Sequence, residues 1–375
     1  MVLSGIGDYG VRERWIAVRN RLLASPRFQR FATRFPLTRP VARRRARALF
    51  DLVAGFSYSQ ILAACVGSGL LEVLADGPQS AAAIAVRIDL PIDGVERLLR
   101  GAAALGLTES LGDVWALGAD GAALRGNPGV AEMVAHHRLL YADLADPIAL
   151  LRRGGGGGAL SGLWGYAEAA GTGDAEAVAA YSALMAASQP MVAAQAIDAY
   201  PFRRHRRLLD VGGGEGAFLA AVGARVANIE LGLFDLPAVA ERGRARLDSH
   251  VLGARTATFG GDFLKDPLPR GFDIISLIRV LHDHDDDPAL ALLRNIHDAL
   301  PPGGTLFIAE PMASVRGIEP VGDAYFGFYL LAMGSGRPRS RAEIAAMLRQ
   351  AGFKRPRNLQ TAMPLTCSAI VATTT

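Results

Sequence analysis

The second half of the chain alternates short apolar runs with segments of helical character, and this rhythm limits the possible folds more than any other feature. The runs are RRLLDV, IELGLF, ATFGG, FDIISLI and GTLFIAE. Strands that alternate with helices form a parallel sheet, because each crossover needs a long connection. The sequence therefore predicts an α/β, doubly wound, Rossmann-like domain over residues 176–375, ending in an antiparallel pair at 354–363 and 367–373. Ligands bind at the carboxyl ends of such strands, so functional side chains should follow each run.

The first run is followed by the glycine-rich turn DVGGGEG, residues 210–216. Glycines allow a tight turn from strand to helix and a close approach of the backbone to a ligand. The pattern by itself also fits a dinucleotide fingerprint, Gly212-x-Gly214-x-x-Ala217. Asp210 stands directly before the turn, where it would repel a pyrophosphate but suit a cationic ligand. This favours a cofactor without phosphate over a nicotinamide dinucleotide.

Two further acids end the next two runs. Asp235 is placed for two ribose hydroxyls, and Asp262 can accept from an adenine amino group that Phe263 covers. Acids without a nearby lysine cluster suit S-adenosylmethionine, which carries a sulfonium and an ammonium and has no phosphate. The alternative is that each acid caps a helix that follows its strand.

The fourth run leads into the densest group of ionisable residues, RVLHDHDDD at 279–287. We interpret His282 as a general base, because its unperturbed pKa of ~6.5 lets it accept a proton at neutral pH. Glu310, at the end of the fifth run, is the predicted partner that holds the imidazole tautomer. A metal site is the alternative, but neighbouring residues in one short loop cannot all face one ion. No metal is expected.

The first half predicts a different kind of domain. Residues 51–75 are almost wholly apolar at helical spacing, so this helix must be buried in a core or against a second subunit. A helix, a second helix from Ile92 and the two-stranded LTESLGDVWALG follow, which is a winged-helix pattern. The charges of the second helix cancel, whereas a helix that reads DNA should be basic. A winged-helix-like dimerisation domain over 51–175 and a homodimer are therefore expected, and neither nucleic-acid binding nor a non-catalytic regulator is favoured. The glycines at 154–158 predict a mobile loop.

Residues 1–50 form a basic leader. They hold twelve Arg against Asp8 and Glu13. The leader can be a solvated helix pair, a contact with anionic lipid headgroups, or, least favoured, a nucleic-acid contact. No run approaches ~20 consecutive apolar residues, and charges interrupt any signal-peptide core. A cytoplasmic protein is expected, and a peripheral position on the inner or photosynthetic membrane is the alternative.

Five segments together carry a family resemblance: DVGGGEG, FDLP, GDF, RVLHDHDDD and PPGGTLFIAEP. Their order and spacing are similar to the S-adenosylmethionine-dependent O-methyltransferases that include plant caffeate and flavonoid enzymes and animal acetylserotonin methyltransferase. The likeness runs from about residue 50 to the end of the chain. It implies that the catalytic base is His282, with Glu310 as a supporting carboxylate, and that the cofactor contacts are Gly212, Asp235, Asp262, Phe263 and Arg279.

Two departures and one narrower likeness bear on the acceptor. The Trp that usually follows the His-Asp pair is His284 here, and the second catalytic Glu of the plant enzymes falls near Pro338. The leader, DAYFGFY and MGSGRPRS resemble the purple-bacterial carotenoid enzymes that act on demethylspheroidene and hydroxyneurosporene. Bacteriochlorophyll and aromatic or polyketide acceptors are the alternatives. Residues 325–333 are expected either to line an apolar acceptor tunnel or to form a plain core helix.

Overall fold

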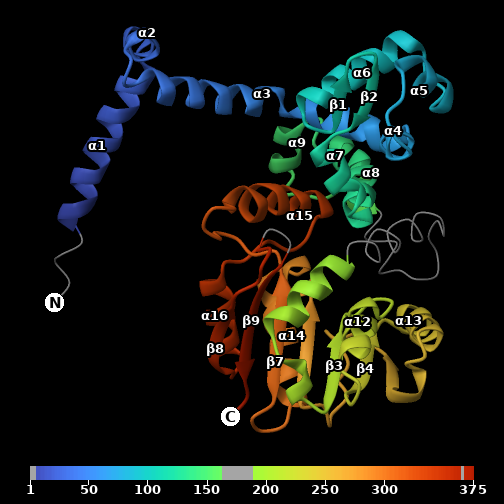
Figure 1. Cartoon of the computed structure of the whole chain (residues 1–375). Coiled ribbons are helices and arrows are strands. Elements are labelled where there is room, and N and C mark those ends of the chain that lie inside the picture. The colour runs from blue at the N-terminus through green and yellow to red at the C-terminus, as the bar shows by residue number, and fades with distance from the viewer. Residues whose placement is uncertain (1–5, 163–188, 365–366) are drawn as a thin grey trace. The chain divides into compact units, whose positions relative to one another are not determined.

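The computed structural model describes residues 6–162, 189–364 and 367–375. The chain divides into two compact units, residues 1–122 and 123–375 (Figure 1). The domain boundary expected between residues 175 and 176 falls within 163–188, outside the described residues, and it stays a prediction.

The leader is helical. Its helices are α1 (Ile6–Ala24), α2 (Pro26–Arg34) and α3 (Arg39–Gly67). Ser25 separates α1 from α2 and its side chain caps α2, and residues 35–38 separate α2 from α3. The structure shows no break at residue 50, because α3 runs from the arginine-rich segment directly into the apolar one. Gly69, with a φ of 72°, ends this run and separates α4 (Leu70–Ala75).

Helix α3 leaves most of its apolar surface uncovered within the single chain. Leu52, Val53 and Phe56 are 81%, 66% and 73% exposed. Over one 18-residue window the mean hydropathy is 1.5, with 6% of the window buried, so α3 meets the length and composition criteria for a membrane span. A single helix of this kind is weak evidence for a span, because helices of soluble proteins meet the same criteria. Exposed apolar side chains in such number indicate that another surface covers this helix.

The rest of the first unit has the predicted helix, helix and wing. Helices α5 (Ala81–Arg87) and α6 (Ile92–Ala104) precede the antiparallel strands β1 (Thr108–Leu111) and β2 (Val114–Leu117), and α7 (Ala119–Arg125) follows them. Val95 and Leu99 of α6 are fully buried, as the apolar spacing of this helix predicts.

The second unit is built on a seven-stranded sheet of order β5-β4-β3-β6-β7-β9-β8 (Figure 1). Strands β3 to β7 pair in parallel, β9 is antiparallel to β7, and β8 is antiparallel to β9. The predicted doubly wound sheet and its terminal antiparallel pair are thus confirmed. The strands are β3 (Arg207–Val211), β4 (Glu230–Asp235), β5 (Thr256–Gly260), β6 (Ile274–Ile278), β7 (Thr305–Glu310), β8 (Lys354–Leu359) and β9 (Ser368–Thr373).

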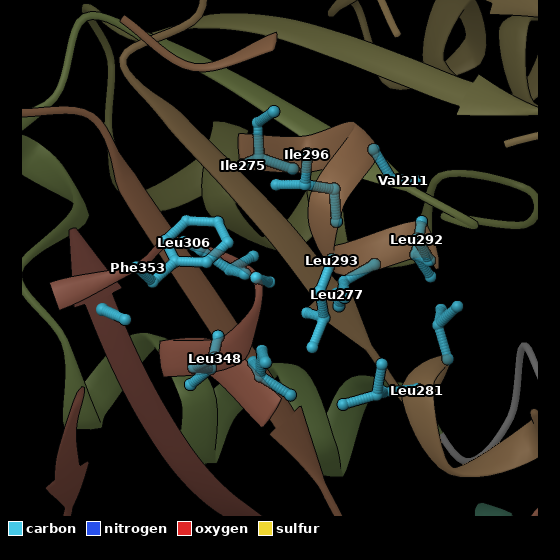
Figure 2. Packing of buried hydrophobic residues seen from close by; sticks show 14 of the residues in the cluster. Val211, Ile275, Leu277, Leu281, Leu292, Leu293, Ile296, Leu306, Leu348 and Phe353 are labelled. Carbon is cyan, nitrogen blue, oxygen red and sulfur yellow. The ribbon is translucent and has the colours of Figure 1, made fainter. Parts of the chain in front are cut away.

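Helices cover both faces of this sheet, because successive side chains of a strand point to opposite faces. Along β6, Ile275 and Leu277 pack against α14 (Asp286–Ala299) and α16 (Arg341–Gln350), as Figure 2 shows. Ile274 and Ile278 face the opposite layer. That layer comprises α12 (Ala217–Arg225), α13 (Pro237–Ser249) and the helical residues 189–199.

A smaller apolar cluster lies elsewhere in this unit. It joins α8 (Pro128–Asp143) and α9 (Pro147–Arg152) to the π-helical segment η4 (Pro320–Phe326) and α15 (Gly327–Met333). Between α9 and residue 158 the glycine run forms the predicted loop, which Gly156 ties to the Leu331 carbonyl by a 2.9 Å hydrogen bond. The buried residues of the small apolar cluster are Leu140, Leu150, Leu160, Leu330, Ala332 and Met333.

Candidate active site

The parallel strands bring the predicted site residues to one edge of the sheet. Gly212 directly follows β3, Asp235 ends β4, and Arg279 directly follows β6. The register pairs Val211 with Phe234, so these positions lie side by side across neighbouring strands. The predicted site residues that end or follow these strands are Gly212, Asp235, Asp262, Phe263, Arg279, His282 and Glu310.

The glycine turn requires glycine at its first position. Gly212 has a φ of +67°, and a Cβ there would lie 2.8 Å from Cγ2 of Val280. Gly214 also has a positive φ, but a Cβ there would meet nothing within 4 Å among the described residues. The backbone of the turn is therefore packed against the protein at Gly212 and open at Gly214.

Asp235 holds this turn in place. One carboxylate oxygen accepts from the Gly214 amide and the other from the Leu236 amide, each at 2.7 Å. Burial raises the pKa of Asp235, and the two backbone hydrogen bonds oppose that shift. The structure shows no side-chain cap at the start of α12 or α13, so Asp235 bonds the turn and does not cap a helix as the alternative predicts.

Asp210 is a buried acid beneath the turn. It is 1% exposed and accepts a 2.6 Å hydrogen bond from the Ser276 hydroxyl. Its second oxygen has no hydrogen-bond partner among the described residues. Burial raises the pKa of Asp210 to about 7, helped by the charge of Asp235 and opposed by the bond from Ser276. An unpartnered carboxylate oxygen in this place fits a cationic ligand and would disfavour a phosphate.

Asp262 and Phe263 follow β5, at the same edge. The hydrogen bond from Lys265, at 2.7 Å, lowers the pKa of Asp262, which also accepts from the Leu264 amide. The ring of Phe263 meets the ring of His284 edge-on at 5.4 Å. The Phe263 ring also lies 3.6 Å from where a Gly212 Cβ would stand, so it borders the turn.

His282 lies in the short 3-10 helix η3 (Leu281–Asp283), which follows β6. Its ring is 4% exposed, and Nε2 lies 3.1 Å from Asp283 Oδ1. Its backbone amide donates to Glu310 Oε2 at 3.1 Å. Neither Nδ1 of His282 nor Oε1 of Glu310 has a hydrogen-bond partner within the part of the chain that the structure describes.

The partner of the imidazole therefore differs from the expectation. The predicted adjacency of the fourth and fifth strands is confirmed, since β6 and β7 pair in parallel and Glu310 does reach His282. Glu310 bonds the backbone, however, and Asp283 bonds the ring. The tight turn of η3 folds the side chain of the next residue back onto the ring, a direction that strand order alone does not reveal.

Charge and burial act in opposite directions on the imidazole. Burial lowers the pKa of His282, but the carboxylates of Asp283 and Glu310 outweigh it, so the pKa is raised overall; Arg279 opposes them. Burial raises the pKa of Glu310, an effect that His282 and Arg339 reduce. A histidine with a raised pKa is a stronger base once it is neutral.

Arg279 has strained backbone. Its φ is +59°, a region that residues other than glycine rarely adopt. Its amide donates to the Ala309 carbonyl at 2.8 Å, which fixes the exit of β6 against β7. Strain of this kind persists only where the surroundings hold it, and it is frequent at functional sites.

The aromatic segment 325–333 divides into two faces. Leu330, Ala332 and Met333 are buried in the small apolar cluster, as the core-helix alternative predicts. Phe326 instead stacks on the ring of His282, with centroids 6.0 Å apart and planes at 30°. It belongs to the π-helical η4, and π-helical turns are frequent at functional sites.

Two histidines of α8, which the sequence reasoning missed, hold the aromatic face. His137 Nε2 lies 2.7 Å from the Tyr325 hydroxyl, and His136 Nε2 lies 3.0 Å from that of Tyr329. Burial lowers the pKa of both histidines, that of His136 to about 4. It raises the pKa of both tyrosines, that of Tyr325 to about 12. The pairs are therefore neutral at physiological pH. The adjacent histidines at 136–137 were the available signal.

The alternative of a metal site depends on the positions of the possible ligand side chains. Among the described residues, no group of three or more His, Cys, Asp or Glu side chains could hold a metal ion.

Comparisons with known proteins place the chain in a family. Residues 141–354 match the O-methyltransferase domain, and residues 50–119 match the O-methyltransferase dimerisation domain. The second match supports the predicted homodimer.

Individual relatives agree with the domain matches. The chain is 44% identical to demethylspheroidene O-methyltransferase of Cereibacter sphaeroides, over 94% of this chain and 93% of the relative. It is 32% identical to acetylserotonin O-methyltransferase of Mus musculus, over 83% and 84% of the two chains. The crystal structure of CalO1, a methyltransferase in calicheamicin biosynthesis with SAH bound, matches at a TM-score of 0.76 and 26% identity, over 88% of this chain and 98% of that one. The chain therefore belongs to the S-adenosylmethionine-dependent O-methyltransferases.

Proposed function

We propose that this protein transfers the methyl group of S-adenosylmethionine to a hydroxyl of a hydroxylated carotenoid, with His282 as the general base. The observation that carries the base is a buried imidazole whose Nδ1 has no hydrogen-bond partner among the described residues, at the edge where the glycine turn lies. The likeness to demethylspheroidene O-methyltransferase supports the class of acceptor.

The cofactor would be held by the residues around the turn. Gly212 and Gly214 would let the backbone approach it, Asp235 and Asp262 would accept its ribose and adenine donors, and Phe263 would cover the adenine. Arg279 would close the site beside His282. The unpartnered oxygen of Asp210 fits the positive charge of S-adenosylmethionine. When bound, the cofactor supplies an electrophilic methyl group on a sulfonium.

His282 would accept the proton of the hydroxyl. Because Asp283 lies against Nε2, that nitrogen carries the hydrogen of the neutral ring and Nδ1 keeps the lone pair. A tertiary alcohol has a pKa near that of water, about 16. Its full ionisation by a base of pKa ~6.5 costs on the order of 13 kcal/mol at ~1.4 kcal/mol per unit. The raised pKa of His282 reduces this difference, and we expect the proton to leave as the oxygen attacks.

Asp283 and Glu310 would stabilise the charged ring that results. Asp283 faces Nε2 directly, and Glu310 lies beneath the same turn. Their charges favour the imidazolium, which lowers the barrier to proton removal.

The aromatic face of η4 and α15 would orient the acceptor. Phe326 lies on His282, and Tyr325 packs edge-on to Phe326 at 4.9 Å. Large flat side chains suit a rigid, conjugated chain. The paired Tyr325 and His137 can line such a surface, because their polar atoms already bond each other.

The leader would bind an anionic membrane surface, where a carotenoid is dissolved. Its twelve arginines stand beside exposed apolar side chains, among them Trp15 at 62%, Phe31 at 54% and Leu37 at 80% exposure. This combination is typical of interfacial helices. Each arginine near such a surface contributes roughly 1 kcal/mol, screened by salt.

The experiment is methyl transfer from labelled S-adenosylmethionine to three acceptors: hydroxylated carotenoids in a pigment extract, a bacteriochlorophyll precursor and caffeate-sized phenols. We expect labelled product from the carotenoids, identified by mass, and negligible turnover of the phenols. Efficient turnover of phenols with no turnover of carotenoids would overturn the proposed acceptor, while methyl transfer itself would still stand.

A parallel assay with anionic liposomes tests the membrane contact. It should show salt-sensitive binding that a chain lacking residues 1–47 has lost. Equal binding by both chains would overturn the membrane contact.

A further inference from the structure

The turn that carries His282 is held by a second segment of the chain. The carbonyls of Leu281 and His284 each accept from Arg339, at 2.8 Å and 2.7 Å. The His282 carbonyl accepts from the Arg337 amide at 2.9 Å. The Asp283 carbonyl accepts from the Ser335 hydroxyl at 3.0 Å. Four consecutive carbonyls, from residue 281 to residue 284, are thus bonded by the segment 335–339, which we call the clamp.

Arg339 is the central member of the clamp. It is 0% exposed, and it is the largest fully buried side chain among the described residues. Besides the two carbonyls it reaches Asp286 at the start of α14, with Nε and Nη2 at 3.0 Å and 2.8 Å from Oδ1. A buried guanidinium needs partners for its donors, and the turn supplies two of the four hydrogen bonds while Asp286 supplies the other two.

The clamp also joins the other side of the site. The Arg339 carbonyl accepts from the amide of Ala313 at 3.0 Å, just after β7, whose last residue Glu310 bonds the backbone of His282. A Cβ on Gly336 would lie within 2.2 Å of the His282 carbonyl oxygen, so the clamp packs directly on the turn. His282 is therefore bounded by backbone contacts from two separate segments.

We propose that Arg339 is a positioning residue that holds the turn 281–284, and through it the imidazole of His282, in the orientation needed for proton transfer. This rests on the proposed role of His282 as the base. Arg339 does not face the ring. The charged groups that act on the ring are Asp283, Glu310 and Arg279. Arg339 holds the backbone of the turn from which Asp283 reaches the ring.

Arginine is needed at this place because of its shape. Its planar fork donates to two carbonyls and a carboxylate at once, whereas a lysine ammonium cannot reach such separated acceptors in fixed directions. Pro338, which stands near the position of the second catalytic Glu in the plant enzymes, has no ionisable group. In this chain the segment therefore acts on the base through backbone contacts.

The test compares Arg339→Lys with Arg349→Lys. The first keeps the charge beside Asp286 and loses the double carbonyl contact. The second makes the same change at an exposed arginine in the last turn of α16, outside the clamp. Ser335→Ala, which removes a single contact to the Asp283 carbonyl, is the milder variant if Arg339→Lys folds poorly.

We expect Arg339→Lys to lower kcat at least tenfold while KM for the acceptor and the cofactor affinity by calorimetry change less than threefold. Amide hydrogen exchange in residues 279–286 should rise at least tenfold, and the acidic limb of kcat/KM should move to lower pH, because looser carboxylates raise the pKa of His282 less. Arg349→Lys should leave kcat, the amide exchange and the acidic limb of kcat/KM near wild type. Ser335→Ala should show the same changes to a smaller extent.

Exchange in 279–286 that is unchanged in folded Arg339→Lys, or a kcat within twofold of wild type, would overturn the clamp. These outcomes are separate from a failure of the proposed function. If His282→Ala keeps full turnover, the base is wrong even when the exchange result holds.

Discussion

The buried acid beneath the glycine turn makes stability depend on pH in a way that one substitution can isolate. We expect Asp210→Asn to stabilise the cofactor-free protein at pH 8 relative to pH 5. The folded pKa of Asp210 is about 7, whereas the unfolded value is ordinary, ~3.9. A raised folded pKa contributes stability that is fully present below the unfolded pKa and is lost as the pH rises through the folded one. The affected window therefore runs from about pH 4 to pH 8.

The magnitude follows from these two values. Between pH 5 and pH 8 the wild type should lose roughly 2.5 kcal/mol of unfolding free energy that the Asn variant does not lose. Asn keeps the size of the side chain and can still accept from Ser276. The quantity compared is how the difference in unfolding free energy between wild type and Asp210→Asn changes with pH. Any pH-independent effect of the substitution therefore cancels. At an m-value of about 3 kcal/mol/M, the relative midpoint should move by roughly 0.8 M urea.

The assay is urea unfolding at pH 5, 6, 7 and 8, at one protein concentration and without cofactor. The exposed Asp287→Asn is the matched control and should run parallel to wild type at every pH. Saturating S-adenosylmethionine should shrink the effect for Asp210→Asn, since a cation near the carboxylate lowers its pKa. Parallel pH curves for wild type and Asp210→Asn, within about 0.5 kcal/mol, would refute a buried acid with a raised pKa at this position.

Three further predictions test other parts of the account. Gly212→Ala should cost about 2–4 kcal/mol of stability, because a left-handed residue is strained and its methyl meets Val280; a loss below 0.5 kcal/mol in thermal unfolding would contradict this. Asp283→Asn should lower the pKa of His282, so the acidic limb of kcat/KM moves to lower pH, and an unmoved limb would exclude Asp283 as the ring partner. Phe56→Asp should disrupt the dimer, because this exposed side chain of α3 lies in the dimerisation region; light scattering that still shows dimers would place the interface elsewhere.

The strands and the edge of the sheet that carries the site were predictable, because both follow from local sequence patterns. Apolar runs mark buried strands, and parallel pairing brings their carboxyl ends to one edge, so Gly212, Asp235 and Glu310 could be placed together from the sequence. The break between α3 and α4 at Gly69 was not predicted, because an apolar stretch on both sides hides one glycine.

The contacts that complete the site depend on side-chain directions in the folded chain. Asp283 replaces Glu310 at the imidazole because of the local turn in η3. Arg339 meets the turn 281–284 across more than fifty residues, and in the sequence it is one arginine in an arginine-rich chain. His137 reaches Tyr325 across an even longer separation. Spacing within a motif carries no information about such pairs.

The most direct test of the account measures methyl transfer and cofactor binding together in His282→Ala. With a carotenoid acceptor and saturating labelled S-adenosylmethionine, kcat should fall by about 10²–10⁴, the usual contribution of general base catalysis. Calorimetry should show a cofactor affinity within tenfold of wild type, because the base is proposed to face the acceptor's proton. Turnover within tenfold of wild type would contradict the role of His282, and a cofactor affinity that falls as far as turnover would show that His282 supports cofactor binding and not proton transfer.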